Sequence, residues 1–190
     1  MTATRFEALL AVPVSDADHI RGPVRAPVTL VEYGDYECPY CGAAAPIVDE
    51  VQQLMADRLR FVYRHFPITT LHPHAEQAAE AAEAAGAQDA FWEMHDLLFV
   101  HQDALAYDDL VGYARQLQLD VDAFEHDLGV RRYARRVARD TASAGENRVA
   151  GTPTFFIDGR RHYGAFDLGT LTASMVTRTN ERRRQSLLPR

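Results

Sequence analysis

The sequence predicts an α/β fold in which a block of helices is inserted into a small sheet domain. Two runs rich in β-branched and aromatic residues, Val28–Tyr33 and Leu59–His65, read as buried strands early in the chain. The strand pattern returns only at Thr154–Ile157, after a long stretch, 74–147, dominated by helix-forming residues. The expected order is therefore β-α-β, then a helical block, then β-β-α.

Length and composition suit one domain, or one domain with an insertion. The chain has 190 residues, of which 47% are hydrophobic, so it can bury a core without disulfides. Its formal charge of −7 argues against a nucleic-acid partner, because such proteins usually present a basic face. Arginines cluster at 131–139 and at 182–184, and we interpret both clusters as solvated surface.

The first residues, 1–26, read as an irregular lead-in closed by turn-forming glycine and prolines. The apolar run Ala8–Val14 is broken by Pro13 and is shorter than the ~20 residues that a bilayer crossing needs. It also lacks the charged start and the small-residue cleavage site of a secretory signal. We therefore expect no membrane insertion and, if Met1 is the true start, a cytoplasmic location.

A helix should follow the first strand and its Gly34. Apolar residues recur there at helical spacing, at Ala44, Ala45, Val48, Val51, Leu54 and Met55. Pro39 suits the first turn of this helix, where a missing N–H costs nothing. Pro46 lies inside the helix and should kink it.

The rest of the chain divides into helices and a hairpin. The inserted block is expected to hold helices over 75–85, 91–99, 105–119, 121–128 and 133–144. A hairpin turning at Asp158–Gly159 and a helix over 168–177 complete the chain. We divide it into a lead-in (1–26), a sheet domain (27–72 and 148–180), an inserted helical domain (73–147) and a basic tail (181–190). Phe91, Trp92, Met94, His95 and Phe99 are interpreted as interior residues.

The chemistry is expected at Cys38 and Cys41, the two cysteines of the chain. A thiol at a helix N-terminus meets unpaired N–H donors and the positive end of the helix dipole, which stabilise its thiolate. The thiolate is the nucleophile, whereas a free thiol of pKa ~8.5 is only slightly ionised at neutral pH. Cys41, one turn further on, can attack a mixed disulfide formed at Cys38. Cys38 is thus the predicted attacking thiol and Cys41 the resolving thiol.

Three other interpretations of the pair stay open. A structural zinc site needs four ligands, so His72 and His74 would have to complete it, and their spacing is a weak ligand pattern. Two inert core cysteines fit poorly with a helix start. A thiol transferase that attaches a small thiol to Cys38 shares most of the chemistry. We expect no metal and no cofactor.

Three segments of the chain resemble a known protein family. They are Val31–Cys41 (VEYGDYECPYC), Phe91–His95 (FWEMH) and Gly151–Ile157 (GTPTFFI). They look like the two signatures and the inserted helical domain of the DsbA-like thioredoxin-fold thiol–disulfide oxidoreductases. The resemblance covers about residues 18–175, nearly the whole chain. It implies a thioredoxin-like fold with a helical insertion domain, and a disulfide oxidoreductase activity.

The resemblance also implies roles for single residues. Pro153 matches the family's cis-proline beside the active site, and the backbone at Thr152 would pair with an extended substrate segment. Glu32 matches a buried acid beneath the resolving cysteine, where burial would raise its pKa and suit it to relay the proton of Cys41. A surface position on an edge strand is the alternative for Glu32.

Two residues lie between the cysteines. Tyr40 should face solvent and modulate the redox potential and partner contacts, as a resemblance-based expectation. Pro39, Tyr40, Thr152 and Pro153 together form the expected substrate-binding set.

Three functions follow as hypotheses. The first is an oxidoreductase that exchanges disulfides with protein thiols and disulfides and relies on an unidentified redox recycling partner. The second is a cytoplasmic reductase or thiol transferase that acts on low-molecular-weight thiol adducts, because the cytoplasm is reducing. The third is a redox-sensing accessory module, since Ser15–Pro23 resembles the entry to domains fused after ion antiporters.

Overall fold

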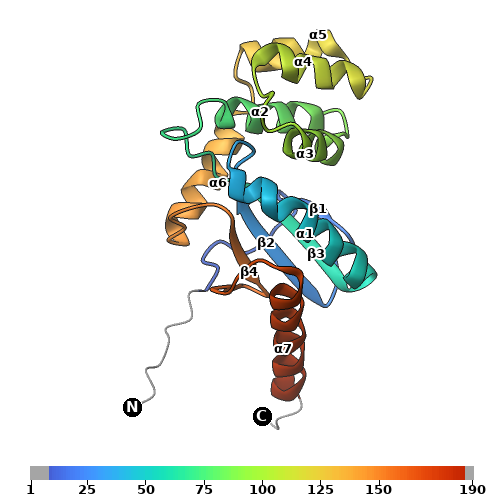
Figure 1. Ribbon diagram of the computed structural model, residues 1–190, viewed down its shortest axis with the longest axis vertical. Helices are drawn as coiled ribbons and strands as arrows, with labels where there is room; N and C mark the ends of the chain where they lie inside the picture. Colours follow the sequence, from blue (N-terminus) through green and yellow to red (C-terminus); the bar gives the residue numbers. More distant parts are fainter. Residues whose placement is uncertain (1–8, 187–190) are drawn as a thin grey trace.

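The computed structural model describes residues 9–186 and contains one five-stranded sheet with helices packed around it (Figure 1). The strand order is β1-β3-β2-β4-β5, with only β2 and β3 parallel. The strands are β1 His19–Arg21, β2 Val28–Gly34, β3 Leu59–His65, β4 Thr154–Ile157 and β5 Arg160–Arg161. The predicted α/β class with a helical insertion is confirmed.

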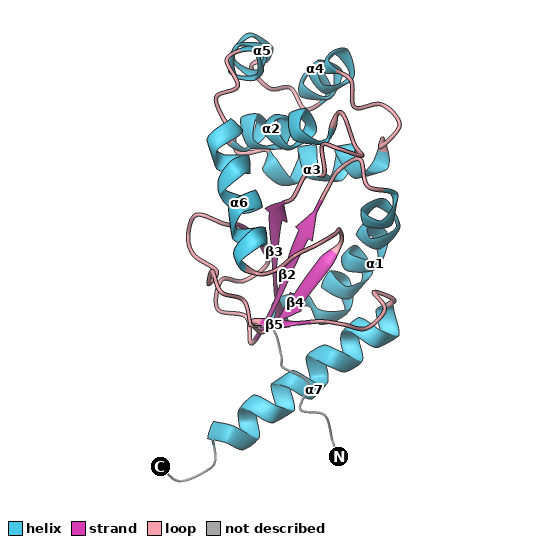
Figure 2. Ribbon diagram, turned by 90° about the vertical axis from the view of Figure 1, so that its left-hand side faces the viewer, coloured by secondary structure: helices cyan, strands magenta, loops and turns pink. Residues whose placement is uncertain are grey.

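The central strands are buried on both faces, which suits their high content of β-branched and aromatic residues. Leu30 of β2 and Phe61 of β3 belong to the larger core, which α1 (Pro39–Met55) and α7 (Leu168–Ser186) share. Val31 and Val62 point to the opposite face and pack with Val149, Phe156 and Ala144, which belongs to α6 (Ala134–Glu146). Figure 2 shows α6 and α1 on opposite sides of the strands. Successive residues of each strand therefore fill two different cores.

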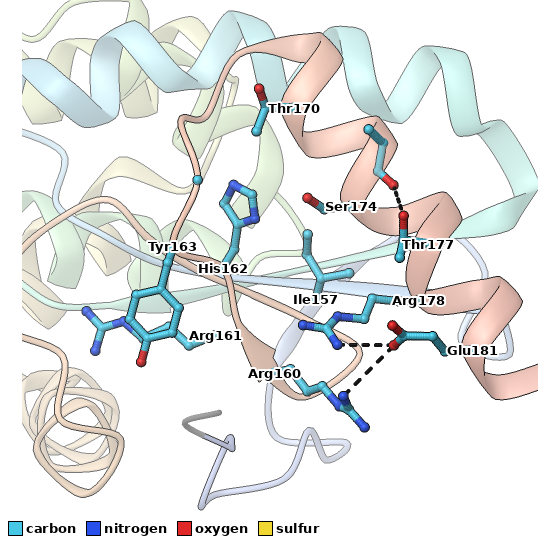
Figure 3. A pocket seen from close by; sticks show the side chains of 12 residues that line it. Ile157, Arg160, Arg161, His162, Tyr163, Thr170, Ser174, Thr177, Arg178 and Glu181 are labelled. Atoms are coloured by element: carbon cyan, nitrogen blue, oxygen red, sulfur yellow. Dashed lines mark hydrogen bonds and ion pairs between the residues drawn. The ribbon is translucent and has the colours of Figure 1, made fainter. Parts of the chain in front are cut away.

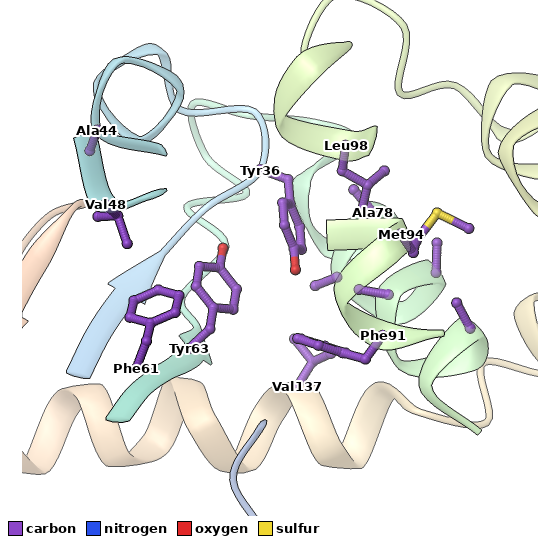
Figure 4. Packing of buried hydrophobic residues seen from close by; sticks show 14 of the residues in the cluster. Tyr36, Ala44, Val48, Phe61, Tyr63, Ala78, Phe91, Met94, Leu98 and Val137 are labelled. Atoms are coloured by element: carbon purple, nitrogen blue, oxygen red, sulfur yellow. The ribbon is translucent and has the colours of Figure 1, made fainter. Parts of the chain in front are cut away.

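Most of the helical block lies beyond the end of the sheet where β2 and β3 finish, and its last helix runs back along one face of the sheet (Figures 1 and 2). Its helices are α2 Ala75–Gly86, α3 Phe91–Val100, α4 Tyr107–Gln116, α5 Val121–Gly129 and α6 Ala134–Glu146. The main core continues from the sheet into this block through Tyr36, Tyr63, Phe91 and Met94 (Figure 4). Phe91 and Met94 are buried, which confirms their interpretation as interior residues.

The structure differs from the predicted elements at three places. The lead-in contains β1, which pairs with β3 through His19 and Tyr63, so an entirely irregular segment was wrong. The three residues of β1 are too few to show a strand's alternation of apolar and polar residues, and they are extended because they pair with the edge of β3. Helix α7 continues to Ser186 and takes in the start of the expected basic tail, whereas residues 187–190 of that tail lie outside the described residues. The second strand of the predicted hairpin was expected at Arg161–Tyr163, whereas β5 spans Arg160–Arg161.

No helix within residues 9–186 is both long enough and apolar enough to cross a membrane.

Candidate active site

Cys38 is the N-cap residue of α1, and Pro39 occupies the first helical turn as predicted. Strand β2 ends at Gly34, and a short turn leads to the cysteine. The Cys38 amide donates to the Asp35 carbonyl oxygen over 3.2 Å, and the Gly42 amide donates to the Cys38 carbonyl oxygen over 3.1 Å. Both cysteines are free thiols, with Cys38 3% exposed and Cys41 fully buried. The end of a buried strand therefore delivers Cys38 to the positive end of a helix.

The Asp35 carboxylate organises the turn before Cys38. Its Oδ1 accepts from the Glu37 amide (2.9 Å), and its Oδ2 accepts from the Ile68 amide (2.8 Å) and lies 2.7 Å from His72 Nδ1. His74 Nδ1 likewise lies 2.9 Å from Glu37 Oε1. Both histidines of the zinc alternative are thus engaged by carboxylates of this turn. Sequence reasoning missed Asp35, although Asp after Gly at a strand end is a known turn signal.

The loop before β4 lies against Cys38. The Thr152–Pro153 peptide bond is cis, as the resemblance implied, and the Cys38 sulfur lies 3.5 Å from the Thr152 carbonyl oxygen, to which it donates only when protonated. Antiparallel pairing of Tyr33 with Thr154 brings this loop to the end of β2 where the cysteine turn begins. The buried Thr152 hydroxyl has no hydrogen-bond partner of standard geometry among the described residues.

These surroundings lower the pKa of Cys38 to about 5. The hydrogen bond with the Cys41 side chain is the largest cause, and burial opposes it. The Thr152 side chain and the backbone amides of Cys41 and Tyr40 lower the pKa further. Cys38 is therefore ionised at neutral pH and ready to act as a nucleophile.

The pKa values of Cys41 and Glu32 are raised, in contrast to that of Cys38. Burial, the hydrogen bond with Cys38 and the charge of Glu32 raise the pKa of Cys41 well above its ordinary value. Burial, followed by the charges of Asp49 and Cys38, raises the pKa of Glu32 to about 8. A buried thiol and a nearby carboxyl that both hold protons tightly are matched for proton transfer between them.

Glu32 lies in the sheet interior at 2% exposure, since β2 runs between β3 and β4. The alternative of an edge-strand surface position was therefore wrong. Its Oε1 is buried and without a partner among the described residues, and the residue lines a cavity of about 310 Å³ between α1 and α3. Ala45, Pro46 and Phe99 line the same cavity. The carboxyl can thus exchange its proton through a small space beside the active-site helix.

The rim of the site is partly apolar. Tyr40 is 66% exposed, as expected, and Pro39 is also exposed. Val100, 72% exposed, lies at the cavity beside α1. A further residue that sequence reasoning missed is Gln102, which donates to backbone carbonyls of the cysteine turn. Nothing in the local sequence around Gln102 signals this contact.

Two other polar features lie away from the cysteines. Glu83 Oε1 is within 2.9 Å of both His19 Nε2 and His65 Nε2, but the Arg136 guanidinium is 3.4 Å from the same oxygen and supplies a positive charge there. An open cavity of about 580 Å³ lies between β5 and α7 (Figure 3). Its Arg178 is already paired with Glu181 over 3.2 Å. We assign no chemistry to either feature.

The fold and the site define the class of protein: a thioredoxin-fold protein with a pair of free cysteines at the start of α1, beside a cis-proline loop. The chain belongs to the thioredoxin family, whose model matches residues 15–175. Among solved structures, BdbD from Bacillus subtilis (oxidised) matches with a TM-score of 0.81 and 22% identity, over 92% of this chain and 99% of that one. A thioredoxin-like oxidoreductase from Silicibacter pomeroyi matches with a TM-score of 0.77 and 27% identity, over 88% and 94% of the two chains.

Curated relatives include much longer proteins. Na(+)/H(+) antiporter NhaA 1 of Salinispora arenicola is 55% identical over 171 residues, which are 88% of this chain and 26% of that protein. Na(+)/H(+) antiporter NhaA of Herminiimonas arsenicoxydans is 45% identical over 179 residues, or 91% of this chain and 28% of that protein. The chain thus spans about a quarter of the length of these relatives.

Proposed function

We propose that this chain exchanges disulfides with protein substrates through Cys38 and Cys41. The observation that carries the proposal is the pKa contrast within the pair: the Cys38 pKa falls to about 5 while that of Cys41 rises. One thiol is thus ready to attack and the other is held in reserve until a mixed disulfide forms.

In the reductive direction, the Cys38 thiolate attacks one sulfur of a substrate disulfide. An S–S bond forms between Cys38 and that sulfur, and the second substrate sulfur leaves as a thiolate. In the mixed disulfide Cys38 no longer carries the charge that helps to raise the Glu32 pKa, so Glu32 loses its proton more readily. The Glu32 carboxylate then takes the proton of Cys41, and the Cys41 thiolate attacks Cys38 Sγ, which releases the first substrate sulfur as a thiolate. The substrate disulfide is reduced and the Cys38–Cys41 pair is oxidised. The reverse sequence oxidises a substrate dithiol, and in either direction a redox recycling partner must restore the pair.

A protein substrate is supported by the surroundings of Cys38. The Thr152 backbone lies beside the sulfur, where an extended peptide could pair with it, and Tyr40 and Val100 present apolar side chains to solvent nearby. A small thiol would make little use of these surfaces. The low Cys38 pKa stabilises the reduced pair. The Cys38 pKa lies between the pKa values of the attacking cysteines of thioredoxin (~7) and DsbA (~3.5). The reduction potential of the Cys38–Cys41 pair should therefore fall between about −270 mV and about −120 mV, the values for those two proteins.

The test is replacement of each cysteine by serine. Cys38→Ser should abolish exchange, and Cys41→Ser should accumulate mixed disulfides at Cys38, identified by mass spectrometry of the protein recovered from cells. Protein adducts support the proposal. Adducts of small thiols alone would favour a thiol transferase acting on low-molecular-weight thiols, and full activity of Cys38→Ser would sink the mechanism.

A second candidate is a redox-sensing module of an ion antiporter, which the similarity to a quarter of the antiporter NhaA 1 favours. A sensor needs to change state once for each change in redox poise, whereas an enzyme turns over repeatedly. Multiple rapid turnovers on a model protein disulfide with excess reductant would argue against the sensor. A single stoichiometric exchange would favour it.

The direction of electron flow through the cysteine pair depends on the cellular compartment in which the chain acts, so we predict the two together. A reducing compartment such as the cytoplasm would make the pair act as a reductase, whereas a pair more oxidising than thioredoxin would need an oxidising partner there. Equilibration of the pair with glutathione buffers measures the potential and separates the two.

A further inference from the structure

Gln102 of the helical block contacts the active-site turn directly. It lies in the turn between α3 and α4, and its Nε2 donates to the carbonyl oxygens of Tyr36 (2.7 Å) and Cys38 (2.9 Å). Tyr36 lies two residues before the nucleophilic cysteine, and the second carbonyl is that of Cys38 itself. The two residues precede Gln102 by 66 and 64 positions in the chain. One side-chain amide therefore holds the backbone on both sides of Glu37.

The first turn of α1 leaves room for this side chain. A Cβ built on Gly42 would collide with Gln102 Oε1 and come too close to the rest of the amide. Gly42 does not have a positive φ, and glycine inside a helix costs stability relative to alanine. The close approach of Gln102 is thus the structural reason for glycine directly after Cys41.

The helical block fixes the position of Gln102. The Tyr113 hydroxyl of α4 donates to the Ala104 carbonyl oxygen over 2.8 Å. The Tyr113 ring also stacks on His101, with ring centroids 5.4 Å apart. The residues on either side of Gln102 are therefore braced against α4.

We propose that Gln102 is a positioning residue through which the helical block helps to set the redox equilibrium of the Cys38–Cys41 pair. The inference rests on the proposed function, because it concerns the same dithiol. Carbonyl oxygens carry partial negative charge, which destabilises a nearby thiolate. An amide that donates to two of them offsets this charge and fixes their orientation, so it favours the Cys38 thiolate and the reduced pair.

The experiment compares Gln102→Met, which keeps the side-chain length without donors, and Gln102→Ala with the unaltered chain. In both variants the equilibrium with glutathione should shift toward the disulfide by about threefold to tenfold, the effect of a typical hydrogen bond. The Cys38 thiolate should also titrate at higher pH, measured by alkylation rate. Gln88→Ala is the matched control. It removes the two hydrogen bonds between the Gln88 side chain and the Asp120 backbone in the helical block, in which Gln88 Nε2 donates to the Asp120 carbonyl oxygen and the Asp120 amide donates to Gln88 Oε1, and both readouts should stay unchanged.

A second comparison uses Gly42→Ala. In the unaltered chain this substitution should displace Gln102, lower the melting temperature and shift the redox equilibrium as Gln102→Ala does. In the Gln102→Ala background it should raise the melting temperature, because alanine is the better helix former once the space is vacant. Additive effects of the two substitutions would contradict the contact.

The outcomes separate this inference from the proposed function. An unaltered chain without a reversible disulfide refutes the proposed function, and the alkylation titration of Cys38 then decides the role of Gln102 alone. A reversible disulfide whose equilibrium and thiolate titration are the same in Gln102→Met overturns the inference and leaves the proposed function intact.

Discussion

The sulfur of Cys38 lies 3.5 Å from the carbonyl oxygen of Thr152, a residue 114 positions later in the chain. The contact joins the two parts of the sheet domain across the whole helical block. It depends on the antiparallel pairing of β4 with β2, which places the cis Thr152–Pro153 bond beside the cysteine turn. The nucleophile and the proposed substrate-binding backbone are thus brought together by the sheet.

The first prediction concerns the pH dependence of Cys38 reactivity. Its pKa of about 5 means that alkylation of reduced protein should be constant at neutral pH and fall with a midpoint near 5. Because this pKa is lower in the folded than in the unfolded state, the thiolate stabilises the reduced fold above the unfolded pKa. That stabilisation is lost as pH falls through 5. Cys41 should resist alkylation throughout, and a midpoint near that of a free thiol would contradict the prediction.

The second prediction concerns the Thr152 hydroxyl. Thr152→Val keeps the shape of the side chain and removes the hydroxyl that helps to lower the Cys38 pKa. We expect that pKa to rise by about one pH unit and the pair to favour its disulfide more strongly. Thr177→Val on exposed α7, whose hydroxyl donates to the Ala173 carbonyl oxygen, is the control and should change neither quantity. If Thr152→Val and Thr177→Val gave the same Cys38 pKa and the same redox equilibrium, the Thr152 hydroxyl would have no part in stabilising the thiolate.

The third prediction concerns Glu32. Its pKa of about 8 exceeds the unfolded value, so its contribution is fully present below the unfolded pKa and is lost as pH rises toward 8. Glu32→Gln should abolish this loss and, at pH 8, raise the free energy of unfolding by at least ~1 kcal/mol.

The same substitution should slow the resolution of mixed disulfides, because Gln cannot take the proton of Cys41. We expect a decrease on the order of 10²-fold at neutral pH, measured by rapid-quench kinetics with a model disulfide. Denaturant unfolding at pH 5 and pH 8 checks the stability effect. A Glu32→Gln protein with unchanged kinetics would leave Glu32 a buried residue without a part in proton transfer.

The fourth prediction concerns the buried ion pair of Arg64 with Asp18. Arg64 Nε and Nη2 donate to the two carboxylate oxygens over 2.7 and 3.1 Å, and both side chains are nearly inaccessible to solvent. Asp18→Asn would leave a buried charge without its counter-ion and should lower the free energy of unfolding by about 3–5 kcal/mol. The exposed pair of Arg132 with Asp127 is the comparison, and Arg132→Met should cost at most about 1 kcal/mol.

The local elements were largely predictable from the sequence. The strands predicted from the β-branched and aromatic runs of β2 and β3, the helix after Cys41 and the strand at Thr154 all appear in the structure. Each depends on a side-chain period of two or 3.6 residues, which neighbours along the chain reveal. Strand β1 could not be predicted in this way, because its three residues take their extended conformation from pairing with β3.

The site divides in the same way. The two cysteines, their spacing and the helix start that activates Cys38 can be predicted without the structure, because they depend on residues within one turn of one another. The cavity beside Glu32, the hydrogen bond from the Ile68 amide to Asp35 and the contact of Gln102 with the cysteine turn were found only in the folded structure. The two hydrogen bonds join residues 33 and 64 positions apart. Their geometry follows from sheet order and helix packing, for which a linear pattern carries no local signal.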